Sequence, residues 1–173
     1  ALDPVSRQEN RTLQALGRGE AALDLMSLDF VAGFLRTVRR TPHAIAVSDA
    51  HASISYAGLY RRSGALAGRL VAAGAGPDRV VGVTIPRSMA TVATFVAIQL
   101  TGSAYQPFDP EFGDSALADR LAAGRIDILV TSRAERDRLS AIAGRLPEDR
   151  RPRTIVIVDP GRSEERRVGK ECP

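Results

Sequence analysis

The chain has 173 residues, of which 44% are hydrophobic, and a formal net charge of +4. That length is enough for one domain with its own core, and no apolar run approaches the roughly 18 residues of a membrane-spanning helix. The small basic excess is scattered and is not interleaved with aromatic side chains, so we expect no nucleic-acid partner and no membrane contact. Cys172 is the only cysteine, which excludes a disulfide within the chain and favours a cytoplasmic location.

Helices and strands are predicted to alternate after a polar, alanine-rich start. Residues 1–25, interrupted by Gly17 and Gly19, are expected to form a linker with one short helix. Beyond them, apolar residues recur at helical spacing or form short β-branched runs between Gly and Pro turn signals. The expected helices end at residues 40, 73, 100, 123 and 146, and the expected strands cover 44–47, 53–55, 80–85, 103–108, 126–130 and 154–158.

Several of these helices begin beside a residue that can act as an N-cap, because its side-chain oxygen can accept a free backbone N–H. Gly124 is expected to stop the fourth helix, and the fifth is expected to start near Arg133. The candidate caps are Ser27 or Asp29, Ser55, Ser88, and Asp114 or Ser115.

The stretch 79–110 organises the predicted fold. Residues 80–85 are expected to form a buried strand, 89–100 an apolar helix that is covered on most sides, and 103–108 a second extended segment. Strand, helix and strand within about 30 residues form a β-α-β unit, which needs a parallel sheet and a right-handed crossover. We therefore predict an α/β protein with a mostly parallel sheet flanked by helices.

No residue pattern in the sequence indicates a catalytic, cofactor-binding or metal-binding site. His43 and His51 are the only histidines, and neither has partners at ligand spacing. The Gly-Ala-Gly run at residues 74–76 follows a helix and precedes a strand, the reverse of a phosphate-binding loop, so we expect a helix-to-strand turn. Tyr105 and Asp109 could be mistaken for an acid–base pair, and we expect packing and turn residues instead.

Two segments carry a family resemblance. Residues 99–110, QLTGSAYQPFDP, resemble the second core motif of adenylation domains in non-ribosomal peptide synthetases, L-K-A-G-x-A-Y-V-P-I-D-P. Residues 54–59, ISYAGL, resemble the first core motif, L-[TS]-Y-x-E-L, with Gly58 where a glutamate would complete a capping box with Ser55. In the second motif the matching positions are Gly102, Ala104, Tyr105, Pro107, Asp109 and Pro110, and the departures are Thr101 and Gln106.

This resemblance implies the front part of the large N-terminal domain of adenylate-forming enzymes, truncated within that domain. Residues 1–25 would follow a condensation domain, and residues 26–161 would be a partial adenylation domain. The longer protein would use ATP and Mg²⁺ to activate an amino acid as its aminoacyl-adenylate. It would then load the amino acid onto the phosphopantetheine of a carrier domain, with carrier and condensation domains as its partners.

The chain itself is expected to be inactive. In the resembled family, phosphates are held by a Gly/Ser/Thr-rich loop ending in Lys-Gly, and catalysis needs a C-terminal lysine. The sequence has no such loop, and its only lysine is Lys170. Residues 162–172, RSEERRVGKEC, resemble the in-frame translation of a sequencing adapter, so we expect residues 162–173 to be non-native.

Two other interpretations stay open. The longer protein could be a fatty acyl-CoA or acyl-AMP ligase, because such enzymes share the adenylate-forming architecture. The chain could also be a self-standing nucleotide-binding or interaction module, in which case residues 1–161 would unfold cooperatively without further domains.

Overall fold

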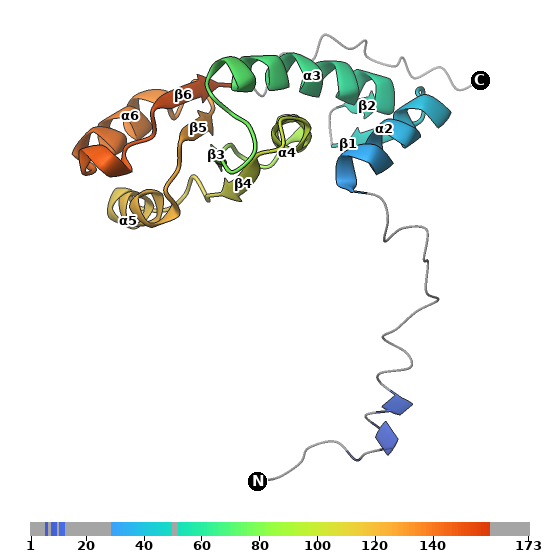
Figure 1. Cartoon of the computed structure of the whole chain (residues 1–173), viewed down its shortest axis with the longest axis horizontal. Helices are drawn as coiled ribbons and strands as arrows, with labels where there is room; N and C mark the ends of the chain where they lie inside the picture. Colours follow the sequence, from blue (N-terminus) through green and yellow to red (C-terminus); the bar gives the residue numbers. More distant parts are fainter. Residues whose placement is uncertain (1–5, 7, 10, 13–28, 50–51, 160–173) are drawn as a thin grey trace.

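The computed structural model describes residues 6, 8, 9, 11, 12, 29–49 and 52–159. Helices and strands alternate within them, as predicted (Figure 1). The helices are α2 (Phe30–Arg40), α3 (Tyr56–Ala72), α4 (Met89–Leu100), α5 (Asp114–Gly124), α6 (Arg136–Arg145) and the short 3-10 helix η2 (Glu148–Arg150). The strands are β1 (Ile45–Ser48), β2 (Ser53–Ser55), β3 (Val80–Thr84), β4 (Ala104–Pro107), β5 (Ile128–Thr131) and β6 (Thr154–Ile157).

The central sheet has the strand order β4-β3-β5-β6, and all its neighbouring pairs are parallel. The predicted α/β class is therefore confirmed, and β3, α4 and β4 form the expected β-α-β unit. Strands β1 and β2 pair antiparallel in a separate hairpin, also as expected. Figure 1 shows this hairpin and α2 at one end of the fold, with α5 and α6 at the other.

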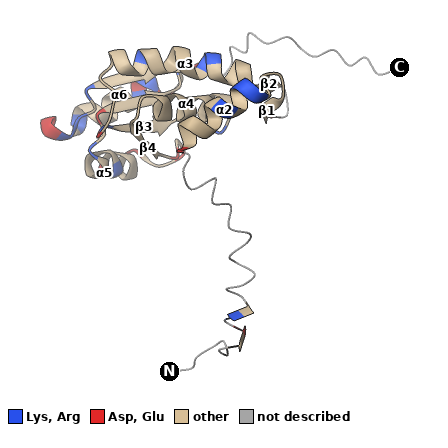
Figure 2. Cartoon of the chain, turned by 45° about the vertical axis from the view of Figure 1, so that its right-hand side comes forward, with Lys and Arg blue, Asp and Glu red and all other residues tan. Residues whose placement is uncertain are grey.

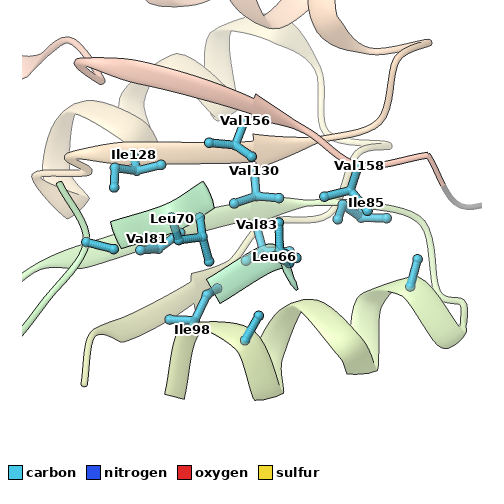
Figure 3. Close-up of a cluster of buried hydrophobic side chains, with 13 residues drawn as sticks. Leu66, Leu70, Val81, Val83, Ile85, Ile98, Ile128, Val130, Val156 and Val158 are labelled. Atoms are coloured by element: carbon cyan, nitrogen blue, oxygen red, sulfur yellow. The ribbon is translucent and has the colours of Figure 1, made fainter. Parts of the chain in front are cut away.

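Helices cover both faces of the parallel sheet. On one face, Leu66 and Leu70 of α3 and Ile98 of α4 pack against alternate side chains of β3, β5 and β6 (Figure 3). On the other face, α5 and α6 contribute a second cluster that includes Leu121 and Leu139. Strands that are covered on both faces are rich in Val, Ile and Leu along their whole length. These strands were therefore predictable from their β-branched runs.

Two of the predicted caps form as expected. Asp29 caps α2, where its Oδ1 accepts the backbone N–H of Ala32 at 2.6 Å. Ser55 caps α3, where its Oγ accepts the backbone N–H of Gly58 at 3.2 Å. Gly58 itself is buried in the first turn of the helix.

The cap expected at Ser88 takes a different form. Ser88 is the N-cap residue of α4, but its side chain makes no capping bond to the backbone. Its Oγ lies 3.3 Å from Thr91 Oγ1, and Thr91 Oγ1 donates to the carbonyl of Pro86 at 2.7 Å. Because the threonine proton is used on Pro86, the Ser88 hydroxyl donates to Thr91, and the serine side chain is oriented toward Thr91 without capping the helix backbone.

The capping residues predicted for α5 were wrong, although the helix ends within one residue of the predicted position. Gly113, not Asp114 or Ser115, is the N-cap residue, and Asp114 lies in the first turn. At the other end Gly124 is still helical, and Arg125 takes the left-handed conformation with φ 47°. A Cβ at Gly124 would lie 2.6 Å from Gln106 Oε1 in β4, so a larger residue there would require this flexible side chain to move.

The remaining differences are small. Helix α6 begins at Arg136 and not at Arg133, because i to i+3 bonds from Glu135 to Ser132 and from Arg136 to Arg133 form a turn first. No helix in the described ranges has the length and apolar character needed to cross a bilayer. The predicted linker, His51 and the tail at residues 162–173 lie wholly or mostly outside the described residues.

Candidate functional site

The carboxyl ends of the parallel strands meet at one edge of the sheet, which we call the carboxyl edge. In open α/β sheets, ligands bind outside this edge, at the point where the strand order reverses. Here β4 lies on one side of β3 while β5 and β6 lie on the other, so the order reverses between β3 and β5. The carboxyl edge is therefore the candidate functional site.

Two buried threonines join β3 and β5 at the reversal point. Thr84 and Thr131 are register partners and are fully buried. The hydroxyl of Thr84 donates to the carbonyl of Val130 at 3.3 Å, and the hydroxyl of Thr131 donates to the carbonyl of Thr84 at 3.4 Å. Both hydroxyl protons are satisfied by the sheet itself, so these residues fix the edge and offer no free donor to a ligand.

The loop that leaves β4 carries the end of the second motif. The backbone N–H of Phe108 continues the ladder by donating to Val83 at 2.8 Å. Asp109 then closes a turn, since its Oδ1 accepts the N–H of Glu111 at 2.9 Å and its carbonyl accepts that of Phe112 at 3.2 Å. The Asp-Pro end of the motif is thus a local turn signal with a visible mechanism.

Arg138, in the first turns of α6, clamps this loop from the other side. Its Nη1 donates to the carbonyl of Pro110 at 2.7 Å, and its Nη2 donates to the carbonyl of Phe112. Its Nε donates to Asp114 Oδ1 at 2.8 Å, and Nη1 also reaches Glu135 Oε2 at 2.9 Å. One planar guanidinium therefore ties together the loop, the start of α5 and the start of α6.

The charges around Arg138 keep it protonated. The carboxylate of Asp114, followed by that of Glu135, raises the pKa of the Arg138 guanidinium above its ordinary value. Phe112 is also held by a second cation, because the guanidinium of Arg120 lies 4.4 Å from the centre of its ring. The arrangement positions a loop, and it offers no group suited to proton transfer.

Two arginines of α3 hold the end of β6 at the same edge. Arg69 Nη2 donates to the carbonyl of Ile157 at 2.8 Å, and Arg62 Nη2 donates to the carbonyl of Asp159 at 3.4 Å. Asp159 also lies 3.4 Å from Arg133, which follows β5. A cavity of about 220 Å³ lies between these groups and the first turns of α4.

The residues considered from the sequence are separated in the structure. The ring of Tyr105 stacks on Phe95 of α4, with centroids 4.4 Å apart, whereas Asp109 turns the chain beyond the strand. His43 is exposed, and residues 74–76 connect α3 to β3, with Gly74 at φ 96°. Within the described ranges, no group of three or more His, Cys, Asp or Glu side chains is placed to hold a metal ion.

Sequence reasoning missed Arg138. Its acceptors Pro110, Phe112 and Asp114 lie 24 to 28 residues earlier in the chain, so no local pattern reveals them. The one available signal was the position of Arg138, which stands immediately before the buried Leu139 near the start of a helix that follows a strand. That signal places a side chain at the carboxyl edge without saying what it contacts.

The comparison with family models gives a match to "AMP-binding enzyme" over residues 34–172. The chain belongs to the AMP-binding enzyme family. The matched range includes α3 with the first motif and β4 with the second, so the two resembling segments lie in the part of the chain that defines the family.

Individual relatives of this AMP-binding chain are large synthetases. A probable non-canonical nonribosomal peptide synthetase, CymA of Salinispora arenicola, is 42% identical over 101 residues, which are 58% of this chain and 1% of that protein. The AMB antimetabolite synthetase AmbB of Pseudomonas aeruginosa is 36% identical over 139 residues, 80% of this chain and 11% of that protein. The chain therefore corresponds to a small part of the relatives that it matches.

Among solved structures, the nonribosomal peptide synthetase FmoA3 in its α-methyl-L-serine-AMP-bound form superposes with a TM-score of 0.62 at 26% identity. The likeness covers 75% of this chain and 14% of the FmoA3 chain. The parallel sheet and its helices are thus the fold of part of an adenylate-forming domain.

Proposed function

We propose that the protein containing this chain activates an amino acid with ATP as an aminoacyl-adenylate and loads it onto the phosphopantetheine of a carrier domain. The observation that carries this proposal is the second motif, which lies on β4 and in the Arg138-clamped loop at the carboxyl edge. Relatives of the chain are named as nonribosomal peptide synthetases, and the structure of one similar synthetase, FmoA3, is an α-methyl-L-serine-AMP-bound form. An amino acid is therefore favoured over a fatty acid as the activated carboxylate.

In this proposal the chain supplies a rigid part of the scaffold and not the reacting groups. Arg138 and Asp109 fix the loop beyond β4, while Arg62 and Arg69 fix the end of β6. Because these groups are already fixed, they lose little conformational entropy when neighbouring segments bind substrate. A scaffold contributes to substrate positioning in this way.

The described residues at the carboxyl edge do not fit Mg²⁺ or the phosphates of ATP. The described residues contain no cluster of carboxylates that could hold a metal ion, and the sequence has no Gly/Ser/Thr-rich loop ending in Lys-Gly. We therefore assign no contact with the reacting ATP or Mg²⁺ to the carboxyl edge of this chain. We further propose that residues 1–25 link to a condensation domain, that residues 26–161 are part of the adenylation domain and that residues 162–173 are not native.

The test is amino-acid-dependent exchange of labelled pyrophosphate into ATP, measured for the chain alone and for the full-length protein recovered from the same gene. We expect exchange with the full-length protein in the presence of one or a few amino acids, and none with the chain alone. Exchange by the chain alone would overturn the scaffold assignment. A full-length protein that responds to fatty acids and to no amino acid would instead be an acyl ligase.

A further inference from the structure

The amino ends of the parallel strands form a second edge, opposite the carboxyl edge, where arginines gather. Main-chain bonds place three strand starts side by side there. The N–H of Asp127 donates to the carbonyl of Val80 at 3.1 Å, and the N–H of Arg153 donates to the carbonyl of Asp127 at 2.8 Å. Figure 2 shows basic segments in blue and a red acidic turn together at this end of the fold, beside α5 and α6.

A pocket of about 500 Å³ opens at this edge. That volume falls within the range of about 300–1,000 Å³ that is typical of small-molecule sites. The backbone segments at its wall come from the start of β3, the end of α5, η2 and the start of β6. The basic side chains that line it are Arg125, Arg150, Arg151 and Arg153.

Most of the acidic charge in this pocket is already neutralised. Asp127 pairs with Arg79 at 3.2 Å, and Asp149 pairs with Arg150 at 3.1 Å. The third lining carboxylate is Asp78, which has no ion pair with any residue that the structure describes. Among the lining carboxylates, that of Asp78 therefore remains to balance the arginines that have no ion pair.

Three guanidinium groups have no carboxylate partner among the described residues. Arg125 and Arg153 make no side-chain hydrogen bond there, and Arg151 donates only its Nε, to the carbonyl of Leu146 at 2.7 Å. Guanidinium groups present paired N–H donors that match the oxygens of a phosphate group. The three guanidinium groups around this concave site carry more positive charge than the single carboxylate of Asp78 can neutralise. They also have more N–H donors than that carboxylate can accept.

We propose that this pocket binds a small anion with phosphate groups, held by Arg125, Arg151 and Arg153. The site is concave and confined to one edge, which suits a compact anion such as a diphosphate better than an extended nucleic acid or an acidic protein surface. It lies across the sheet from the carboxyl edge, so it is separate from the site of the proposed adenylation. The proposal depends only on this chain and not on the proposed function of the longer protein.

The experiment is equilibrium dialysis of the 173-residue chain against labelled inorganic pyrophosphate, orthophosphate and ADP at low ionic strength. We expect saturable binding that weakens as salt is added, because the arginines are exposed. Tighter binding of pyrophosphate would identify a free diphosphate as the ligand, and tighter binding of ADP would identify a nucleotide. Absence of saturable binding with all three probes overturns the proposal.

Variants locate the site. The double substitution Arg125→Gln and Arg153→Gln should raise the Kd about tenfold or more, since each charge-assisted bond contributes substantially to binding. The matched control, Arg87→Gln with Arg136→Gln, removes the same charge from exposed positions after β3 and at the start of α6, on the side of the carboxyl edge, and should leave the Kd nearly unchanged. Equal losses in both double variants would mean non-specific attraction and would refute the site.

A variant of opposite sign separates binding from misfolding. Asp78→Asn removes the unpaired carboxylate and should lower the Kd several-fold, because a negative charge beside the anion is lost. Asp78 has a left-handed backbone with φ 60°, a conformation that asparagine also tolerates. Tighter binding cannot result from a damaged fold, and an unchanged or raised Kd would contradict the proposal.

Discussion

Gly82→Ala should destabilise the fold, because Gly82 lies where β3 is pressed closely by side chains from the α5 and α6 side. A Cβ at this position would lie 2.9 Å from Ile126 Cγ2, 3.0 Å from Leu129 Cδ1 and 3.1 Å from Phe108 Cε2. All three neighbours are buried, so each must move within an already filled core. Overpacking of this kind costs about 1–3 kcal/mol, and the lower chain entropy of alanine in the unfolded state returns roughly 0.4–1 kcal/mol.

We therefore expect Gly82→Ala to lower the free energy of unfolding by about 1–2 kcal/mol, measured by urea denaturation followed by circular dichroism. Gly68→Ala is the matched control, because Gly68 is exposed within α3 and a Cβ there would meet no atom within 4 Å. It should raise the free energy of unfolding by about 0.5–1 kcal/mol. If Gly82→Ala were as stable as the parent while Gly68→Ala gained as expected, the tight packing around β3 would be refuted.

Three further outcomes follow from particular contacts. Ser55→Ala should lower the free energy of unfolding by about 1 kcal/mol, and Ser88→Ala by less than about half of that, since of these two serines Ser55 alone bonds the helix backbone. Equal losses for the two variants in urea denaturation would contradict this. Arg138→Gln should speed hydrogen exchange of amides in the loop after β4, because Arg138 bonds two carbonyls of that loop. The control Arg136→Gln on the same helix should leave the exchange rate unchanged. Unchanged exchange in both variants would show that the Arg138 contacts are dispensable. Exposed edge strands favour association between chains, and β4 is an edge strand of the described sheet with Tyr105 40% exposed on it. Tyr105→Lys should therefore reduce concentration-dependent light scattering. Scattering as strong as in the parent would exclude β4 as the strand through which chains associate.

Sequence patterns predicted the elements well where the physical signal is local. Strand β3 and helix α4 were found because a β-branched run and an apolar stretch stand between turn residues. The capping residues of α5 were predicted wrongly because neighbouring residues offer similar local signals. Gly113, not Asp114 or Ser115, is the N-cap residue, and Arg125, not Gly124, takes the left-handed backbone at the other end.

The candidate site was less predictable than the fold because it is built from contacts between residues far apart in the sequence. The turn at Asp109 is local and was expected from the motif, but the Arg138 clamp joins residues more than 20 positions apart. The order β4-β3-β5-β6, which places the carboxyl edge, depends on pairings between strands that no single segment encodes. The phosphate pocket is also non-local, because Arg125 and Arg153 approach each other only when β5 and β6 pair.

The most direct test of the central claim is a long sequencing read across the gene that encodes this chain. If the chain is part of an amino-acid adenylation domain, the reading frame should continue past Gly161 into a phosphate-binding loop resembling Y-T-S-G-[ST]-T-G-x-P-K-G, with glycines for close backbone approach and hydroxyls as donors to phosphate. The segment RSEERRVGKEC should then be absent. A read that retains this segment, followed by a genuine stop codon and no such loop, would contradict the account and favour a self-standing module.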